Sequence, residues 1–149
     1  MMWLNPGMSG CLIVAHTTLT KMMMTILWRG PGSAASKMPG GDNWFAVKDK
    51  LEKLPGYEIM SATQKNEAEY APLFAAALFF CELKGIAVPI ASTLALAGQV
   101  MYYWPRWMLA NPKTNSNNGF PFYVPGALMR YASLIMLSLA MYKAERKGN

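Results

Sequence analysis

The stretch "KNEAEYAPLF", residues 65–74, places two carboxylates, Glu67 and Glu69, directly before a long apolar run. Acid at the start of an apolar helix is favourable, because the positive end of the helix dipole attracts carboxylates. Asn66 followed three residues later by Glu69 also has the pattern of a capping box, in which the two side chains satisfy free backbone N–H groups. The stretch therefore predicts a helix over residues 66–84, beginning at Asn66.

The composition is typical of a membrane protein. Of the 149 residues, 53% are hydrophobic and 15% are charged, whereas about 25% of an average soluble domain is charged. Trp and Tyr often stand at the ends of the apolar runs, where a boundary between lipid and water favours them. The length fits one domain, residues 1–149, and the composition predicts that this domain lies in a lipid bilayer.

The apolar runs predict helices that cross this bilayer. The first run would reach about 30 Å as a helix, which is the thickness of a hydrocarbon core, and we expect it to be retained because no basic region precedes it. Gly85 interrupts the next run, and Pro89 suits the first turn of the helix that follows. Residues 29–65 are predicted as a loop with a short amphipathic helix. The sequence predicts an all-α integral membrane four-helix bundle, with spans at about residues 8–28, 66–84, 88–104 and 124–142.

Two further patterns concern helix packing and topology. Ala91, Ala95 and Gly98 give the third span a small-residue surface, which lets helices in lipid approach closely. The loops at residues 29–65 and 106–113 carry more Lys and Arg than the opposite ends of the spans. The positive-inside rule then places these larger loops toward the cytosol, or toward the matrix or stroma of an organelle. We expect a multi-pass protein of an intracellular membrane: endoplasmic reticulum, mitochondrial or plastid.

The sequence has no motif for a disulfide framework, a metal site, a hydrolase or a nucleic-acid-binding protein. Cys11 and Cys81 both lie in apolar segments, so no disulfide framework is predicted. No metal-binding motif, phosphate loop or Ser-His-Asp set is present. The net charge of +6 is scattered among carboxylates, which does not indicate a nucleic-acid partner.

The wider pattern around the opening stretch resembles a known family. Asn66-x-x-Glu69-Tyr70-x-Pro72-x-Phe74 is similar to the "N-x-x-E-Y-x-P-x-F" signature that opens the second helix of the MAPEG family, the membrane-associated proteins in eicosanoid and glutathione metabolism. The stretch "PGALMRYASL" resembles the family's "PG-x-x-L-R" start to the fourth helix, and Tyr102 stands near the end of the third. The resemblance covers residues 64–142.

The resemblance implies a fold and a site. MAPEG proteins are four-helix bundles that associate as homotrimers and, where active, bind glutathione between subunits. Glu69 would then contact the α-amino group of the tripeptide, and Arg29 would clamp a carboxylate. The residues that the resemblance predicts to bind this cofactor are Asn66, Glu69, Tyr70, Tyr102, Arg29 and Gln64.

The chain also departs from the family pattern. Ala62, Gln99 and Tyr123 (or Val124) stand where the family usually has arginines. A glutathione thiol, with a pKa of about 8.5, needs a nearby cation to become a thiolate at neutral pH. Arg106 and Tyr102 are the remaining candidate catalytic residues.

Two functions follow as alternatives. The first is a glutathione transferase or peroxidase that acts on lipophilic electrophiles or lipid hydroperoxides. The second is a non-catalytic protein of MAPEG fold, either an accessory subunit of a larger membrane complex or a lipid-binding protein. The expected partners are the lipid bilayer, further copies of the chain or a larger complex, and a lipophilic ligand.

Overall fold

The protein is built from four helices in the part of the chain that the structure describes. The computed structural model describes residues 5–24, 57–111, 116–117 and 120–148. A pair of two-residue strands, β1 (Ala110–Asn111) and β2 (Ser116–Asn117), joins antiparallel between the last two helices. The prediction of an all-α fold is confirmed. The helices are α1 (Pro6–Met24), α4 (Tyr57–Leu83), α5 (Pro89–Met108) and α6 (Phe120–Gly148).

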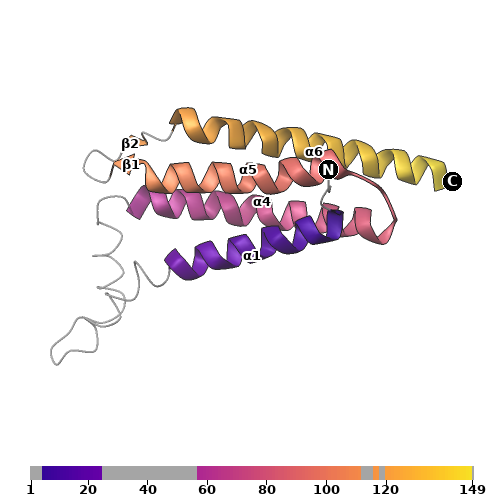
Figure 1. Cartoon of the computed structure of the whole chain (residues 1–149), viewed down its shortest axis with the longest axis horizontal. Coiled ribbons are helices and arrows are strands. Elements are labelled where there is room, and N and C mark those ends of the chain that lie inside the picture. Colours follow the sequence, from indigo (N-terminus) through magenta and orange to yellow (C-terminus); the bar gives the residue numbers. More distant parts are fainter. Residues whose placement is uncertain (1–4, 25–56, 112–115, 118–119, 149) are drawn as a thin grey trace, which may run out of the picture.

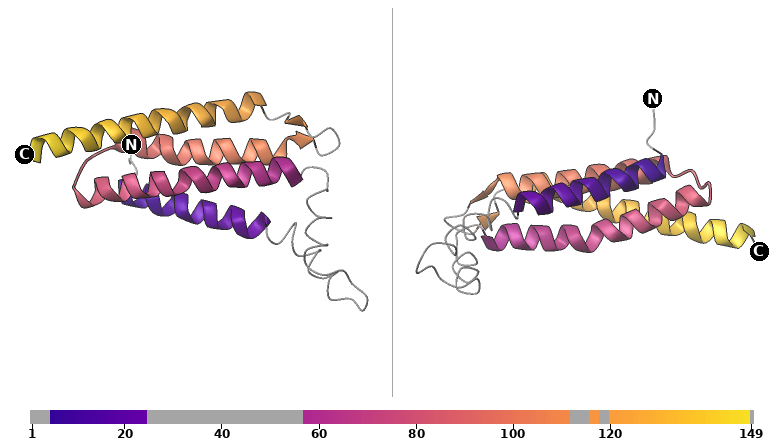
Figure 2. Two further views of the ribbon diagram at one scale, coloured as in Figure 1. Left: turned by 180° about the vertical axis from the view of Figure 1, so that it is seen from behind. Right: turned by 90° about the horizontal axis from the view of Figure 1, so that it is seen from below.

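The helices run antiparallel to their sequence neighbours, as Figures 1 and 2 show. α1 packs on α4 and α5, while α6 packs mainly on α5 and less on α4. The start of α1, the loop between α4 and α5, and the end of α6 lie at one end of the bundle, and the strands lie at the other (Figure 1). Apolar side chains from all four helices fill the core, among them Ile13, Phe74, Leu78, Ala95 and Leu137.

The turn from α4 to α5 follows the sequence prediction. Gly85 adopts a φ of 63°, a left-handed conformation that glycine tolerates. The Ile86 N–H donates to the Cys81 carbonyl at 2.8 Å, and the Gly85 N–H donates to Glu82 at 3.1 Å. These two bonds form a Schellman motif, which satisfies the last carbonyls of α4. Pro89 then begins α5, as predicted.

Two glycines let α5 and α6 approach closely. A Cβ atom added at Gly98 would lie 3.0 Å from the Gly126 carbonyl oxygen. A Cβ atom at Gly126 would overlap the backbone of Tyr102 and lie 2.7 Å from the carbonyl carbon of Met101. Ala91, also buried on this surface, accepts a hydrogen bond on its carbonyl from the Ser133 hydroxyl at 2.8 Å. The small-residue surface predicted for the third span is therefore a helix contact.

The prediction that the second helix begins at Asn66 is wrong. α4 begins at Tyr57, so residues 57–65, predicted as loop, are helical and Asn66 lies more than two turns inside the helix. The physical reason is that Ile59 and Met60 are buried and extend the apolar face of α4 backwards. Asn66 and Glu69 consequently do not form a capping box. The predicted amphipathic helix within residues 29–65 and the candidate Arg29 lie outside the described residues.

The other helix bounds differ less. α1 begins at Pro6 because the Asn5 side chain caps it, accepting from the Met8 N–H at 2.7 Å. The carboxylate of Glu82 also accepts from the Gly7 N–H at 3.2 Å, which ties the start of α1 to the end of α4. α5 and α6 extend beyond the predicted spans, to residue 108 and over residues 120–148.

One described helix can cross a membrane by length and composition. This segment of α6 runs over Pro121–Arg146. Its outward face is apolar, with Leu128 63% exposed and Ile135 62% exposed. Apolar side chains exposed in a continuous row are favourable against lipid and unfavourable against water.

Candidate functional site

Arg130 is the centre of a polar cluster between α6 and α4. Its side chain is 2% exposed, although it carries a charge. The Nη1 atom donates to the Asn66 side-chain oxygen at 2.8 Å, and the Nη2 atom donates to the Asn66 backbone carbonyl at 3.3 Å. A buried cation is costly without partners. Asn66 therefore accepts hydrogen bonds from Arg130 and does not cap the start of α4.

Two tyrosine rings cover this guanidinium. The Arg130 Cζ atom lies 3.9 Å from the ring centroid of Tyr70 and 4.4 Å from that of Tyr102. Both contacts are cation–π interactions, which strengthen when the cation is shielded from water. The Tyr70 hydroxyl also donates to the Tyr131 hydroxyl at 3.3 Å. Three of the predicted binding residues, Asn66, Tyr70 and Tyr102, thus lie together around Arg130.

Arg106 provides a second cation beside the same tyrosine. Its Nη1 atom donates a hydrogen bond to the Tyr102 hydroxyl. The Cζ atom lies 5.3 Å from the ring centroids of both Tyr102 and Tyr123. Unlike Arg130, Arg106 is only half-buried, and no carboxylate of the described residues pairs with it. The candidate catalytic residues Arg106 and Tyr102 are therefore in direct contact.

The other predicted residues lie apart from this cluster. Glu69 is on the exposed side of α4, next to Tyr70 in sequence. Gln64 faces another neighbour, because its side-chain oxygen accepts from the Tyr103 hydroxyl at 3.4 Å. Gln99, one of the departures from the family pattern, is fully buried in α5 and makes no side-chain hydrogen bond with described residues.

Glu67 is a buried polar residue whose contacts the sequence analysis did not predict. It is 0% exposed, and its Oε1 atom lies 2.7 Å from the Nδ1 atom of His16 on α1. The Thr17 hydroxyl donates to the same oxygen at 3.1 Å. The His16 ring also meets the Tyr103 ring edge-on, with centroids 5.6 Å apart. Glu67 thus joins α1 to α4 through a polar contact inside the bundle.

Helical periodicity could have identified Glu67. Ala71, Phe74 and Leu78 follow it at spacings of four, seven and eleven residues, and all three are buried. Glu69 falls outside this series. The buried position of the Glu67 carboxylate could therefore be predicted from the sequence. His16, the one histidine of the chain, also stands out as a polar residue in an apolar run.

The two charged side chains described in this cluster, Arg106 and Arg130, are both cations. Among the described residues, no group of three His, Cys, Asp or Glu side chains could hold a metal ion. No family model, curated protein or solved structure matches the chain. The MAPEG resemblance therefore depends on the motifs quoted above.

Proposed function

We propose that the protein is a multi-pass membrane protein of MAPEG type, with all four helices in the bilayer. The distribution of side chains supports this proposal, because polar groups face the interior while large apolar groups face outward. Ser9, Glu67, Gln99, Arg130 and Ser133 are buried, as expected where hydrocarbon surrounds the helices. The outward apolar side chains include Leu12, Val14, Leu19 and Met22 on α1 and Leu128, Ile135 and Leu139 on α6.

The proposed location is an intracellular membrane, of the endoplasmic reticulum, a mitochondrion or a plastid. The end of the bundle that carries the Arg106 cluster would face the cytosol, matrix or stroma. Glutathione, a water-soluble tripeptide, would reach the site from that side. The thiol site would then lie at the end of the bundle where the loops carry the most Lys and Arg.

The proposed activity is glutathione-linked transfer to lipophilic electrophiles, or reduction of lipid hydroperoxides. The observation that carries it is the half-buried Arg106, held against Tyr102 and without a described carboxylate partner. A cation in this state favours an anion beside it, and a thiolate is such an anion. Arg106 would replace the arginines that the family usually has at the positions of Ala62, Gln99 and Tyr123.

Tyr102 would assist as a hydrogen-bond donor. Its hydroxyl oxygen accepts from Arg106, so its own proton is free to point toward the glutathione sulfur. Accepting a charge-assisted hydrogen bond also polarises the hydroxyl and makes it a better donor. Tyr102 would therefore stabilise the thiolate, and Glu69 would bind the α-amino group of the tripeptide from the exposed side of α4.

The experiment that tests this activity measures thiolate formation. Ultraviolet difference spectra of the detergent-purified protein with glutathione report the fraction of bound thiol that is ionised. We expect a thiolate band at neutral pH that Arg106→Gln removes. Arg146→Gln is the matched control, because Arg146 also lies against a tyrosine ring, 5.6 Å from the centroid of Tyr142, at the other end of α6. An Arg106→Gln band equal to that of the wild type would contradict the role of Arg106.

A second function is supported by the way Arg130 is held. Asn66, Tyr70 and Tyr102 already have a partner inside the chain, so these residues are explained without glutathione. The alternative is a non-catalytic subunit of a larger membrane complex, or a lipid-binding protein. Mass measurement of the particle extracted from native membranes in mild detergent tests the subunit reading. A particle larger than three copies of the chain would favour it.

A further inference from the structure

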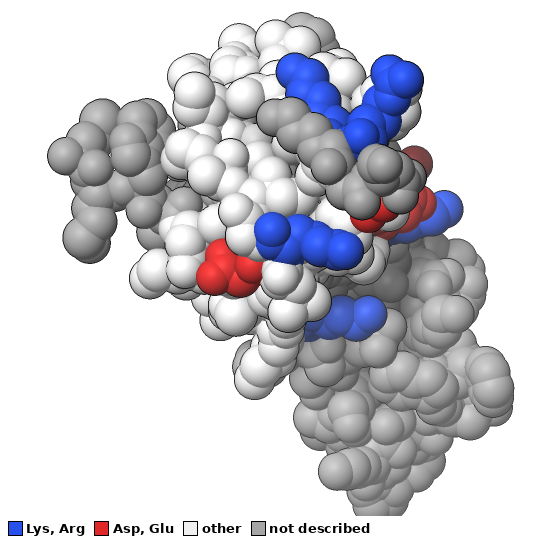
Figure 3. All heavy atoms as spheres, turned by 90° about the vertical axis from the view of Figure 1, so that its right-hand side faces the viewer, with Lys and Arg blue, Asp and Glu red and all other residues white. Residues whose placement is uncertain are grey.

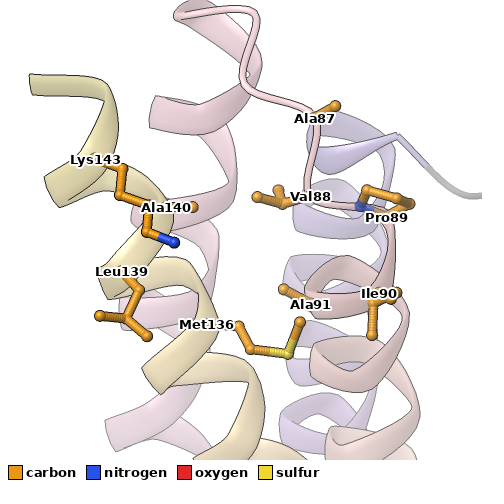
Figure 4. A pocket seen from close by; sticks show the side chains of 9 residues that line it. All are labelled: Ala87, Val88, Pro89, Ile90, Ala91, Met136, Leu139, Ala140 and Lys143. Atoms are coloured by element: carbon orange, nitrogen blue, oxygen red, sulfur yellow. The ribbon is translucent and has the colours of Figure 1, made fainter. Parts of the chain in front are cut away.

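A groove lies between the start of α5 and the last part of α6. It has a volume of about 370 Å³, within the range of roughly 300–1,000 Å³ that is usual for small-molecule sites. Its walls are aliphatic, as Figure 4 shows, and include Val88, Ile90, Ala91, Met136, Leu139 and Ala140. The groove is at the opposite end of α5 from Tyr102 and Arg106, so it is separate from the proposed thiol site.

Lys143 is the one charged side chain among the residues that line the groove. In Figure 4 the Lys143 side chain turns toward the space between the helices, above Met136. No carboxylate of the described residues pairs with it. Figure 3 shows Lys and Arg side chains on this face of the molecule, with Asp and Glu side chains among them. The groove therefore combines an apolar channel with a cation at its outer end.

We propose that this groove binds one acyl chain of an anionic phospholipid, with the phosphate group against Lys143. The inference uses the membrane placement proposed above and does not depend on glutathione. Lys143 directly follows the predicted end of the last span at residue 142, where a lysine reaches the headgroup layer. An acyl chain that extends from the headgroup layer into the bilayer would lie directly against the aliphatic walls of the groove.

The charge of the headgroup decides which lipid binds. An acyl chain gains little by moving from the bilayer into an aliphatic groove, because both surroundings are equally apolar. A lysine near the membrane surface favours an anionic lipid over a neutral one by about fivefold. The first turn of α5 adds partial positive charge at the same place, since its N-cap residue, Val88, offers no side-chain acceptor.

The test is lipid binding to the full-length protein in detergent, followed by native mass spectrometry. The protein is titrated with phosphatidylglycerol, phosphatidylcholine and a fatty acid, all with the same acyl chain. We expect phosphatidylglycerol to bind about fivefold more tightly than phosphatidylcholine, and Lys143→Gln to remove this difference. Lys84→Gln is the matched control and should keep it, because Lys84 is at the same end of the bundle but lies over the Phe80 ring, outside the groove.

A substitution that fills the groove provides a second test of lipid binding. Ala140→Leu places a larger side chain on the groove wall and should lower phosphatidylglycerol binding to the phosphatidylcholine level. If circular dichroism shows that Ala140→Leu does not fold, Ala87→Trp at the exposed rim replaces it.

Four results would overturn the inference. The first is equal binding of the two phospholipids to the wild type, and the second is a preference for phosphatidylglycerol that survives Lys143→Gln. The third is tighter binding of the fatty acid than of phosphatidylglycerol. The fourth is a change in oligomeric mass in Ala140→Leu while the preference for phosphatidylglycerol stays unchanged. The last result would make the groove a contact between copies of the chain. Glutathione binding measured on the same samples separates this outcome from failure of the proposed thiol site.

Discussion

Glu67 and His16 connect two helices through a largely buried polar contact, with 2.7 Å between the Glu67 Oε1 and His16 Nδ1 atoms. The carboxylate comes from the core face of α4, and the imidazole comes from the middle of α1. The contact therefore fixes which part of α1 lies beside which part of α4.

Removing one partner of this pair should destabilise the bundle. His16→Leu leaves the Glu67 carboxylate buried with Thr17 as its remaining donor, and losing a hydrogen bond to a charged group costs about 1.5–3 kcal/mol. The double variant His16→Leu/Glu67→Leu should recover part of this loss, because no uncompensated charge remains. Thermal unfolding in detergent measures the wild type, His16→Leu, Glu67→Leu and the double variant. Strictly additive effects of the two substitutions would show that the pair does not interact.

Asn66 and Glu69 should differ sharply in their effects on stability. Asn66→Ala removes the side-chain acceptor of the buried Arg130 but keeps the backbone carbonyl, and a lost hydrogen bond to a charged group costs about 1.5–3 kcal/mol. Glu69→Ala changes an exposed side chain, so we expect a change within about 0.5 kcal/mol. Chemical or thermal unfolding compares the two variants. A larger loss for Glu69→Ala than for Asn66→Ala would restore the capping-box interpretation of this stretch.

The close contact of α5 and α6 depends on Gly126. Gly126→Ala places a methyl group against the backbone of Tyr102 and Met101, which cannot move without separating the helices. We expect a loss of about 3 kcal/mol or more, at the upper end of overpacking effects. Gly85→Ala is the control, because its Cβ atom meets nothing within 4 Å and its positive φ costs about 1–2 kcal/mol. Equal losses in the two variants would argue against a tight α5–α6 contact.

The outward face of α6 should tolerate no charge if it faces lipid. Ile135→Lys introduces a lysine in the middle of the candidate span, which costs about 2.5–3.5 kcal/mol for membrane insertion. Glu145→Lys, near the end of the same helix, should insert normally. Insertion into microsomes, read by glycosylation of added acceptor sites, measures both variants. Normal insertion of Ile135→Lys would contradict the exposure of this face to lipid.

The turn between α4 and α5 and the α5 surface were predictable because they depend on local chemistry. Gly85 supplies a left-handed backbone, Pro89 fits a first helical turn, and the small residues at 91, 95 and 98 repeat at helical spacing. Each of these signals acts within a few residues of chain. These features could therefore be predicted without knowing which distant residues they contact.

The roles of Asn66 and Glu67 were not predicted because they depend on residues far away in sequence. Asn66 fits a cap by local pattern, but Arg130 uses its side chain from a separate helix. Glu67 fits a helix start by charge, and although helical spacing places it on the buried face of α4, its partner His16 lies on a separate helix. Tertiary contacts outweighed local preference at both positions, and the start of α4 was misplaced for the same reason.

The most direct test of the central claim is calorimetry of glutathione binding to the detergent-purified protein. Wild-type protein should bind glutathione in the micromolar to millimolar range, corresponding to about −8 to −4 kcal/mol. Arg106→Gln and Glu69→Gln should each weaken binding by roughly tenfold or more, since each removes a charge-assisted contact, while Arg146→Gln should leave it unchanged. No heat of binding at millimolar glutathione, or equal affinity in Arg106→Gln and wild type, would contradict a glutathione site at Arg106.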